Sequence, residues 1–205
     1  GGLRYPGVLA SVLRLYFDEP FFRARSVLGA LLFASFGVFW TPLTFLLAAP
    51  PYSYSNTVIG LFGLAGAVGA LAARRFGHLA DRGLGNQSTM LGLGLLLLSW
   101  LPIAMGQLHL PALLLGVVLL DLAIQGVHVT NMSAIYRLNP EARSRLTAGM
   151  MTANFIGAAA GSIGSSWIYS KAGWLGVCAI GALLAALALL QATCVPSARI
   201  PRDSA

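Results

Sequence analysis

Residues 111–138 read PALLLGVVLLDLAIQGVHVTNMSAIYRL, an apolar run longer than the roughly 20 residues that a helix needs to cross a bilayer. The run begins with Pro111, a favoured residue in the first turn of a helix, and one acidic residue, Asp121, interrupts it. Five further apolar stretches occupy residues 26–48, 55–73, 89–105, 146–169 and 174–194. The sequence therefore predicts an all-α membrane protein with six transmembrane helices.

The composition is that of a membrane protein. Of the 205 residues, 57% are hydrophobic and 9% are charged, and the mean hydropathy is +0.78. A soluble domain carries about 25% charged residues. The net charge of +7 comes from short basic segments between apolar stretches, which topology and anionic lipid head groups explain, so no nucleic-acid partner is expected. Cys178 and Cys194 lie in one apolar stretch, too far apart to pair, and no disulfide framework is predicted.

Basic residues alternate with the apolar stretches and predict the topology. Of the 13 Lys and Arg residues, only Lys171 lies in the gaps at 49–54, 106–110 and 170–173. Because cytoplasmic loops are enriched in Lys and Arg, these gaps are expected outside and both termini in the cytoplasm. The predicted organisation is a cytoplasmic linker or amphipathic helix at 1–25, a transmembrane domain at 26–194 and a cytoplasmic tail at 195–205.

Small residues form stripes on two of the stretches. The glycines concerned are Gly60, Gly63 and Gly66 in the second stretch, and Gly157, Gly161 and Gly164 in the fifth. Such stripes let helix backbones approach closely in lipid, and they are predicted to be helix interfaces. The third and sixth stretches are rich in Leu and Ala, whereas the first and fourth carry polar groups. This succession predicts a 3+3 internal repeat, inverted because successive three-helix units start on opposite sides of the membrane.

Asp121 lies near the middle of the fourth stretch, where a bare carboxylate is costly and must be protonated, paired or in contact with water. Gln125 and His128 share its helix face, and Asn131 lies to one side. One interpretation is that these groups form hydrogen bonds that fix helix packing. The other is a proton-coupling site lining a cavity, since burial favours the neutral form of a carboxyl group and histidine titrates near neutral pH.

The first stretch supplies further candidates for a cavity wall. Thr41 and Thr44 are three residues apart and share a helix face, and Trp40 lies beside them. An aromatic ring in this position could stack on a ligand, but it could equally be an anchor at the membrane interface.

Two loop motifs carry a resemblance to a known family. The segment Gly77-His78-Leu79-Ala80-Asp81-Arg82 resembles the G-x-L-a-D-R/K loop signature of the major facilitator superfamily, although Leu84, Gly85 and Asn86 replace its basic end. The segment from Tyr136 to Arg145, YRLNPEARSR, resembles the Y-x-L-x-P-E-A-R-S-R stretch of bacterial members. The degraded first motif is typical of the second half of such proteins.

The resemblance implies the C-terminal six-helix half of a twelve-helix transporter, most similar to the drug-efflux-type proton antiporters, in the inner membrane of a bacterium. It implies that the first and fourth helices line a central cavity and that the second and fifth face the other half. The implied partners are protons, a small organic solute, the lipid bilayer, and either the missing N-terminal six-helix half or a second copy. The loop residues Gly77, Asp81 and Arg82 would then set conformation. No cofactor or metal is implied.

The sequence allows two alternatives to a transporter half to be weighed, and the first of them remains open. A chain without its pseudo-symmetric half could be a truncated, non-transporting remnant or an assembly partner. An intramembrane enzyme is not expected, because neither H-E-x-x-H nor G-x-S-x-G occurs, and Asp121, His128 and Ser133 lack a supporting catalytic arrangement.

Overall fold

The computed structural model describes residues 5–194, with side chains described except at residues 5–10, 74, 77, 79–81 and 140. Within that range all regular structure is helical. The elements are α1 (Tyr5–Asp18), α2 (Pro20–Ala48), α3 (Asn56–Ala72), α4 (Arg74–Leu79), the π-helical η1 (Ala80–Leu84), α5 (Gly85–Met105), α6 (Leu110–Tyr136), the 3-10 helix η2 (Pro140–Ala142) and α7 (Arg143–Cys194). An all-α architecture is thereby confirmed for the described residues.

α2 begins six residues before the apolar stretch predicted from the sequence. Glu19 is extended and separates α2 from α1, and Pro20 occupies the first turn, where its fixed φ favours a helix and its missing N–H costs nothing. The 29 residues of α2 span about 44 Å at 1.5 Å per residue. The N-terminal helix α1 packs on the molecule through Tyr16, whose hydroxyl donates to the carbonyl of Gly149, 2.5 Å away.

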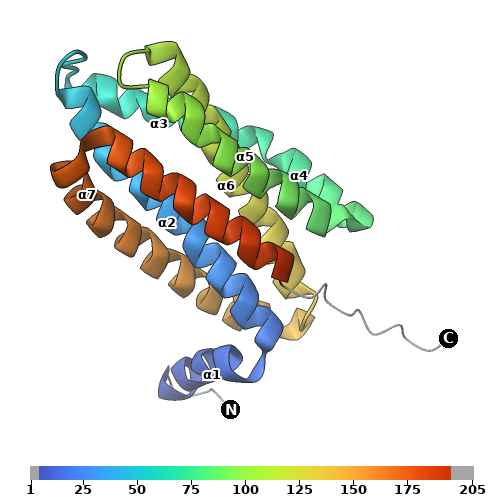
Figure 1. The fold of residues 1–205 in the computed structure, drawn as a ribbon. Helices are drawn as coiled ribbons and strands as arrows, with labels where there is room; N and C mark the ends of the chain where they lie inside the picture. Colours follow the sequence, from blue (N-terminus) through green and yellow to red (C-terminus); the bar gives the residue numbers. More distant parts are fainter. Residues whose placement is uncertain (1–4, 195–205) are drawn as a thin grey trace.

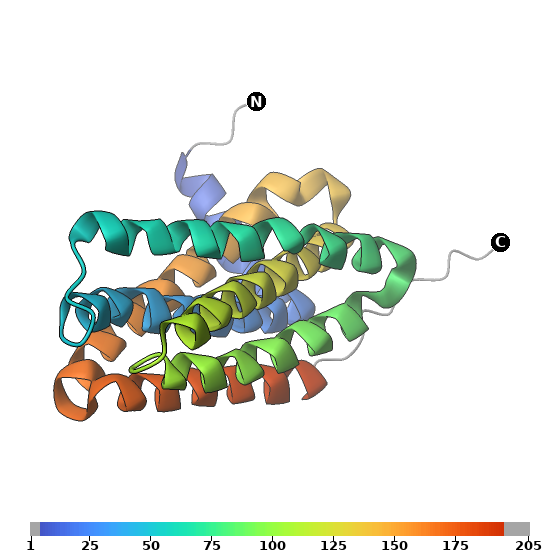
Figure 2. The same ribbon diagram turned by 90° about the horizontal axis from the view of Figure 1, so that it is seen from above.

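Local signals fix both ends of the α3–α4 segment. The Ser55 side chain accepts a hydrogen bond from the Val58 amide and caps α3. Only Ala73 separates α3 from α4, and the two run as nearly one rod before the chain turns back into α5 (Figure 2). Gly83 makes that turn with a φ of 82°, a left-handed conformation that glycine adopts without a steric penalty.

α7 is a hairpin rather than a single rod. Its 52 residues would span about 78 Å, far more than a bilayer's hydrocarbon core of about 30 Å. Gly173, with φ 63° and ψ −159°, interrupts the helix, and Figure 1 shows its two arms lying antiparallel. The first arm, residues 143–172, and the second arm, residues 174–194, correspond to the fifth and sixth apolar stretches of the sequence.

Four segments of the described chain are long and apolar enough to cross a membrane. They are Pro20–Ala48, Arg82–Met105, Leu110–Tyr136 and Arg143–Cys194, and the shorter apolar helix Asn56–Ala72 accompanies them. This fits an all-α membrane protein. The predicted count of six spans and the 3+3 repeat stay predictions. The reasons are that α3 by itself is short for a span, and that α7 is apolar along its whole length and counts as one segment despite the break at Gly173.

The loops sort to opposite ends of the bundle. The three short loops at 49–54, 106–110 and 170–173 lie at one end, and the turn at 80–85 and the segment at 137–142 lie at the other (Figures 1 and 2). The loops that carry few basic residues therefore share one end. Which end faces the cytoplasm stays a prediction from the charge pattern.

Two kinds of packing hold the bundle together. Large aromatic side chains fill the interior, where Phe39 lies edge-on to Trp100 and Trp174 with ring centroids 6.2 Å apart in each pair. The indole N–H of Trp174 donates to the Ile103 carbonyl at 2.9 Å, which satisfies its polar group in an otherwise apolar place. Small residues form the second kind, a seam between α2 and the first arm of α7.

The α2–α7 seam brings the two helix backbones into direct contact. A Cβ atom added at Gly157 would meet the Ala30 carbonyl, and one added at Gly161 would meet the Ala34 carbonyl. On the opposing helix, a Cβ at Gly37 would meet the backbone of Ala158. Close approach of this kind increases van der Waals contact in lipid, where burial of apolar surface gives no net driving force.

Candidate functional site

Asp121 lies at the meeting point of α2, α3 and α6 and is only 5% exposed. The indole N–H of Trp40 on α2 donates to its carboxyl oxygen Oδ1 at 3.3 Å. A Cβ at Gly66 on α3 would collide with the other oxygen, Oδ2, and with the Trp40 ring. The absence of a side chain at Gly66 therefore gives the carboxyl group its space.

The charge balance around Asp121 decides what this carboxyl group can do. In the described part of the chain no Lys, Arg or His forms an ion pair with it, and Trp40 is its hydrogen-bonding partner. One neutral donor does not offset the loss of water around a full negative charge. A carboxylate in this place is therefore costly unless water or another group reaches it.

An aromatic row on α2 continues from Trp40 toward the opposite end of the bundle. Phe36 lies 6.0 Å from Trp40, and Phe33 lies 6.3 Å from Phe36, measured between ring centroids. Phe33 in turn contacts the His128 ring of α6 edge-on at 5.3 Å. The row is half-buried, and its neighbouring rings are tilted by 38° and 42° to one another, so it forms an apolar aromatic strip along α2.

His128 and Gln125 extend the polar side of α6. The Nδ1 atom of His128 is buried and has no hydrogen-bonding partner, and Gln125, one turn from Asp121, is half-buried. Of the predicted site residues, the structure thus brings Trp40 of α2 to Asp121 of α6, while His128 contacts Phe33 instead and Gln125 lies on the same face of α6 as Asp121. Unpartnered buried nitrogens are uncommon in proteins, so His128 is a polar side chain that the packing of α6 against α2 does not satisfy.

The remaining predicted cavity residues have other surroundings. The Thr41 hydroxyl donates to the Ser162 hydroxyl of α7 at 3.0 Å and so belongs to the α2–α7 seam, while Thr44 is exposed and donates to the Thr41 carbonyl. Asn131 is fully buried at the far end of α6, where its amide donates to the Arg25 carbonyl at 2.8 Å. Hydrogen bonding thus places none of these three beside Asp121.

The predicted interface glycines divide into two groups. Gly66 contacts the Asp121–Trp40 pair, and Gly157 and Gly161 contact the backbone of α2, so all three sit at helix contacts within the chain. No atom lies within 4 Å of a Cβ built at Gly60, Gly63 or Gly164. These three glycines stand on the open faces of α3 and α7. That the other half of a transporter, or a second copy of this chain, covers those faces stays a prediction.

Little of the loop motif can be placed. Gly77 and the side chain of Asp81 lie outside the described side chains, and Arg82 is exposed. The predicted contact of Asp81 with a neighbouring helix therefore stays a prediction.

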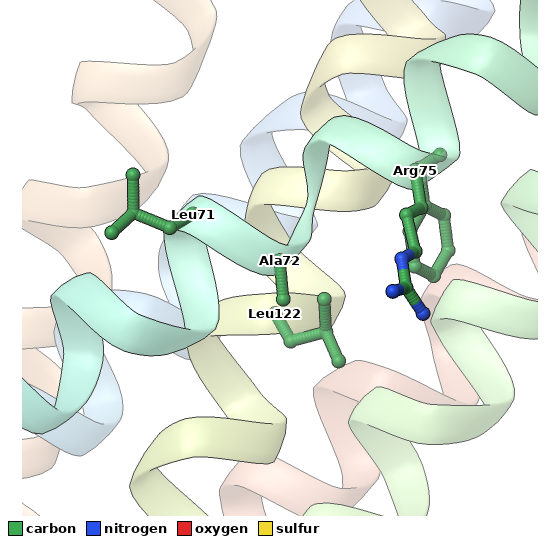
Figure 3. Close-up of a pocket in the computed structure, with 5 residues that line it drawn as sticks. Leu71, Ala72, Arg75 and Leu122 are labelled. Atoms are coloured by element: carbon green, nitrogen blue, oxygen red, sulfur yellow. The ribbon is translucent and has the colours of Figure 1, made fainter.

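A surface groove of about 610 Å³ lies on the outer flank of the site. It is lined by Leu71, Ala72, Arg75, Phe76 and Leu122, contributed by α3, α4 and α6. Figure 3 shows Ala72 and Leu122 facing each other across the two helices, with Leu71 and Arg75 toward opposite ends. The groove is separate from the Asp121–Trp40 contact. Its apolar walls and single cation are typical of a lipid-facing surface.

Sequence reasoning missed a second group of buried polar residues. Arg25 and Ser26 on α2 and Asn154 on the first arm of α7 are buried, with exposed fractions of 8%, 2% and 0%. A polar residue in the fifth apolar stretch is the signal that points to Asn154. Arg25 belongs to the basic segment that precedes the first apolar stretch, and only the packing of α2 places it inside. No group of three or more metal-ligating side chains occurs among the described residues.

Comparison with known proteins shows which proteins this chain is similar to. No family model matches it. It is 53% identical, over 188 residues and 92% of its length, to the uncharacterized transporter YgaY of Escherichia coli strain K12. The YgaY protein of Escherichia coli O157:H7 shows the same identity over the same share of the chain. The chain spans about half, 48%, of the length of these relatives.

This is an integral membrane protein. The apolar helices and the relatives named as transporters agree on that point. The similarity does not extend to a family name, since neither relative is described beyond the word transporter.

Proposed function

We propose that this chain is one half of a secondary, proton-coupled transporter of the major facilitator type, of the efflux kind, acting on a small organic solute. Three observations support the proposal. The chain resembles proteins named as transporters over about half their length. Its two loop motifs resemble those of the superfamily. Its membrane interior carries a carboxyl group with no cationic partner among the described residues.

The observation that carries the proposal is the Asp121–Trp40 contact. A carboxyl group in the apolar middle of a helix bundle is costly unless it serves a purpose such as proton transfer. Asp121 is held by the indole N–H of Trp40 at 3.3 Å, on a helix contact formed by Gly66. It would bind a proton when the site closes and release it when water enters from one side, which is the behaviour that coupling requires.

The neighbouring residues would divide the remaining work. Gln125 and His128 continue the polar face of α6 and would carry the proton path through ordered water. Phe33, Phe36 and Trp40 on the facing helix would contact the apolar part of the solute. Because Trp40 contacts both the aromatic row and Asp121, solute bound against its ring would disturb the hydrogen bond to the carboxyl group.

A proton-flux assay tests the proposal with a library of small organic solutes rather than with one chosen compound. The chain is reconstituted in vesicles together with the other half of the full-length protein, and a pH-sensitive dye inside reports the protons that each solute moves. A solute that moves protons in the wild type should move none in Asp121→Asn, since the amide mimics the neutral acid and cannot release a proton. Asp18→Asn, on exposed α1, is the matched control.

Two results would contradict the proposal. Solute-driven proton movement that persists in Asp121→Asn would place coupling elsewhere and leave Asp121 a packing residue. The second contradicting result would be that no solute moves protons in the wild type when both halves are present. That absence would favour the alternative, a non-transporting remnant or assembly partner. Running the chain alone beside the two-half sample shows whether it is sufficient by itself.

A further inference from the structure

The surface groove between α3, α4 and α6 combines apolar walls with one positive charge. Leu71, Ala72 and Leu122 form the apolar walls, and Arg75 supplies the charge. None of the residues that line the groove is acidic, and its volume of about 610 Å³ is in the range of ligand-binding pockets, roughly 300–1,000 Å³. A ligand complementary to this groove therefore has an apolar part and a negative charge.

The Arg75 guanidinium is available to bind such a ligand. Arg75 is exposed, and in the part of the chain whose side chains are described no residue forms a hydrogen bond or an ion pair with it. Its side chain leaves α4 on the side on which Leu122 lies (Figure 3). A guanidinium can donate two parallel N–H groups to the oxygens of one phosphate, so this group suits a phosphate as well as any anion in proteins.

The position of Arg75 along the molecule matches the edge of a bilayer. α3 begins at Asn56, at the end of the bundle that carries the short loops (Figure 2). Because α3 and α4 run as nearly one rod, Arg75 lies about 29 Å beyond Asn56 at 1.5 Å per residue, and the hydrocarbon core of a bilayer is about 30 Å thick. The guanidinium is therefore expected at the head-group level of the opposite leaflet.

The apolar part of the groove lies deeper in the membrane. Leu71 and Ala72 precede Arg75 by about one helical turn and share its face. Leu122 lies about 18 Å along α6 from the start of that helix at the short-loop end, which places it near the middle of the bilayer. The groove thus runs from the head-group level toward the membrane interior, the direction in which a lipid acyl chain lies.

Close helix packing forms the floor of the groove. Phe76 is 7% exposed, and a Cβ added at Gly126 of α6 or at Gly92 of α5 would press on its ring. Beside it, a Cβ at Gly69 of α3 would meet the backbone of α6 at Leu122. Because backbone contact fixes α3 against α6 there, the groove is a preformed feature of the helix packing and does not depend on one loose side chain.

We propose that this groove is a binding site for an anionic phospholipid, whose phosphate binds the Arg75 guanidinium and whose acyl chain lies along the apolar walls. Basic pockets between transmembrane helices on the cytoplasmic side hold acidic lipid head groups, and the groove opens at the end of the bundle that carries the basic loops. The bound lipid bridges α3, α4 and α6 beside Asp121. This site would exist whether or not the chain transports a solute.

Phosphatidylglycerol and phosphatidylcholine with the same oleoyl chains are suitable probes, because they share the chains and the phosphate but differ in net charge. Each lipid is titrated into the purified chain in a neutral detergent, and native mass spectrometry gives the apparent affinity of the first lipid bound. Phosphatidylglycerol should bind more tightly than phosphatidylcholine. Arg75→Gln should weaken phosphatidylglycerol binding about fivefold, the loss expected for one basic residue at an acidic head group, and should remove most of the difference between the two lipids.

Matched variants separate the charge of the groove from its shape. Arg145→Gln removes an exposed charge at the same end of the bundle but outside the groove, and it should leave phosphatidylglycerol binding unchanged. Ala72→Phe fills the groove without a change of charge and should weaken the binding of both lipids. Ala67→Phe adds the same bulk at an exposed position of α3 that does not line the groove, and it should leave both affinities unchanged. Circular dichroism checks that each variant is folded.

Several outcomes would overturn the lipid site. Equal affinities of the wild type for the two lipids would do so, and so would equal losses in Arg75→Gln and Arg145→Gln, which would show that acidic lipids gather at this end of the bundle without a specific site. Equal losses in Ala72→Phe and Ala67→Phe would rule out the groove. Displacement of phosphatidylglycerol by inorganic phosphate at constant ionic strength would assign Arg75 to a free anion. Absence of proton movement in the vesicle assay, with lipid binding at Arg75 retained, would count against the transport mechanism alone.

Discussion

A single missing side chain shapes the surroundings of Asp121. Gly66 stands where any Cβ would overlap both the carboxyl oxygen and the Trp40 ring, so the hydrogen bond between Trp40 and Asp121 depends on glycine at that place. Gly63, three residues earlier on the same helix, has no atom within 4 Å of the equivalent position. The two glycines share a pattern in the sequence but differ in what they contact.

Gly66→Ala is expected to destabilise the chain by about 1–3 kcal/mol, the usual cost of an added methyl group in a packed site. The added carbon must displace the Asp121 carboxyl group or the Trp40 ring. Gly63→Ala should be neutral or slightly stabilising, since alanine favours a helix more than glycine. Unfolding in detergent followed by circular dichroism compares the two, and equal behaviour would contradict the assigned contact.

At the level of the elements, the α2–α7 seam explains why the glycines of α7 differ in effect. Gly157 and Gly161 meet carbonyl groups of α2, and backbone atoms cannot move aside as a side chain can. The Thr41–Ser162 hydrogen bond closes the same seam further along. Gly164 lies on the same arm but contacts nothing within 4 Å.

Gly161→Ala should therefore push the first arm of α7 away from α2 and lower the melting temperature, with a loss of about 1–3 kcal/mol. Gly164→Ala is the control on the same helix and should have little effect. Gly92 on α5 would be a poor control, because a Cβ there would meet Val127 and Phe76. A Gly164→Ala variant less stable than Gly161→Ala would show that the seam is assigned to the wrong glycines.

For the whole molecule, the arrangement of loops bears on the predicted topology. The loops at 49–54 and 170–173 lie at the end opposite the start of α7 (Figure 1). Ser53 and Ser144 are both exposed at these opposite ends, so neither is shielded from a reagent by the fold. The basic residues gather near Ser144, which favours the cytoplasm for that end.

Cysteine labelling in intact cells tests this topology. The background variant replaces the exposed Cys194 by serine, while Cys178 is buried and stays. A membrane-impermeant maleimide should label Ser53→Cys in intact cells, and Ser144→Cys only after the membrane is permeabilised. The reverse pattern would invert the predicted orientation.

The sequence by itself determined the helices of this protein and several of their ends. Apolar runs of sufficient length, Pro20 at the start of α2, Ser55 before α3 and Gly173 between the arms of α7 act through local conformational preferences that neighbours in the chain supply. Hydropathy alone singled out Asp121 as the acidic residue that is costly to place within an apolar stretch. The structure shows that Asp121 is buried.

Only the tertiary structure decided which of these residues meet. The rotation of α2 about its axis brings Trp40, rather than Thr41, to Asp121, and the same rotation buries Arg25 beside Asn131. The approach of α2 to α7 gives Gly157 and Gly161 a partner and leaves Gly164 open. Helical periodicity places residues on a face but says nothing of the helix that covers it, because that choice depends on how whole surfaces of small and large side chains fit together.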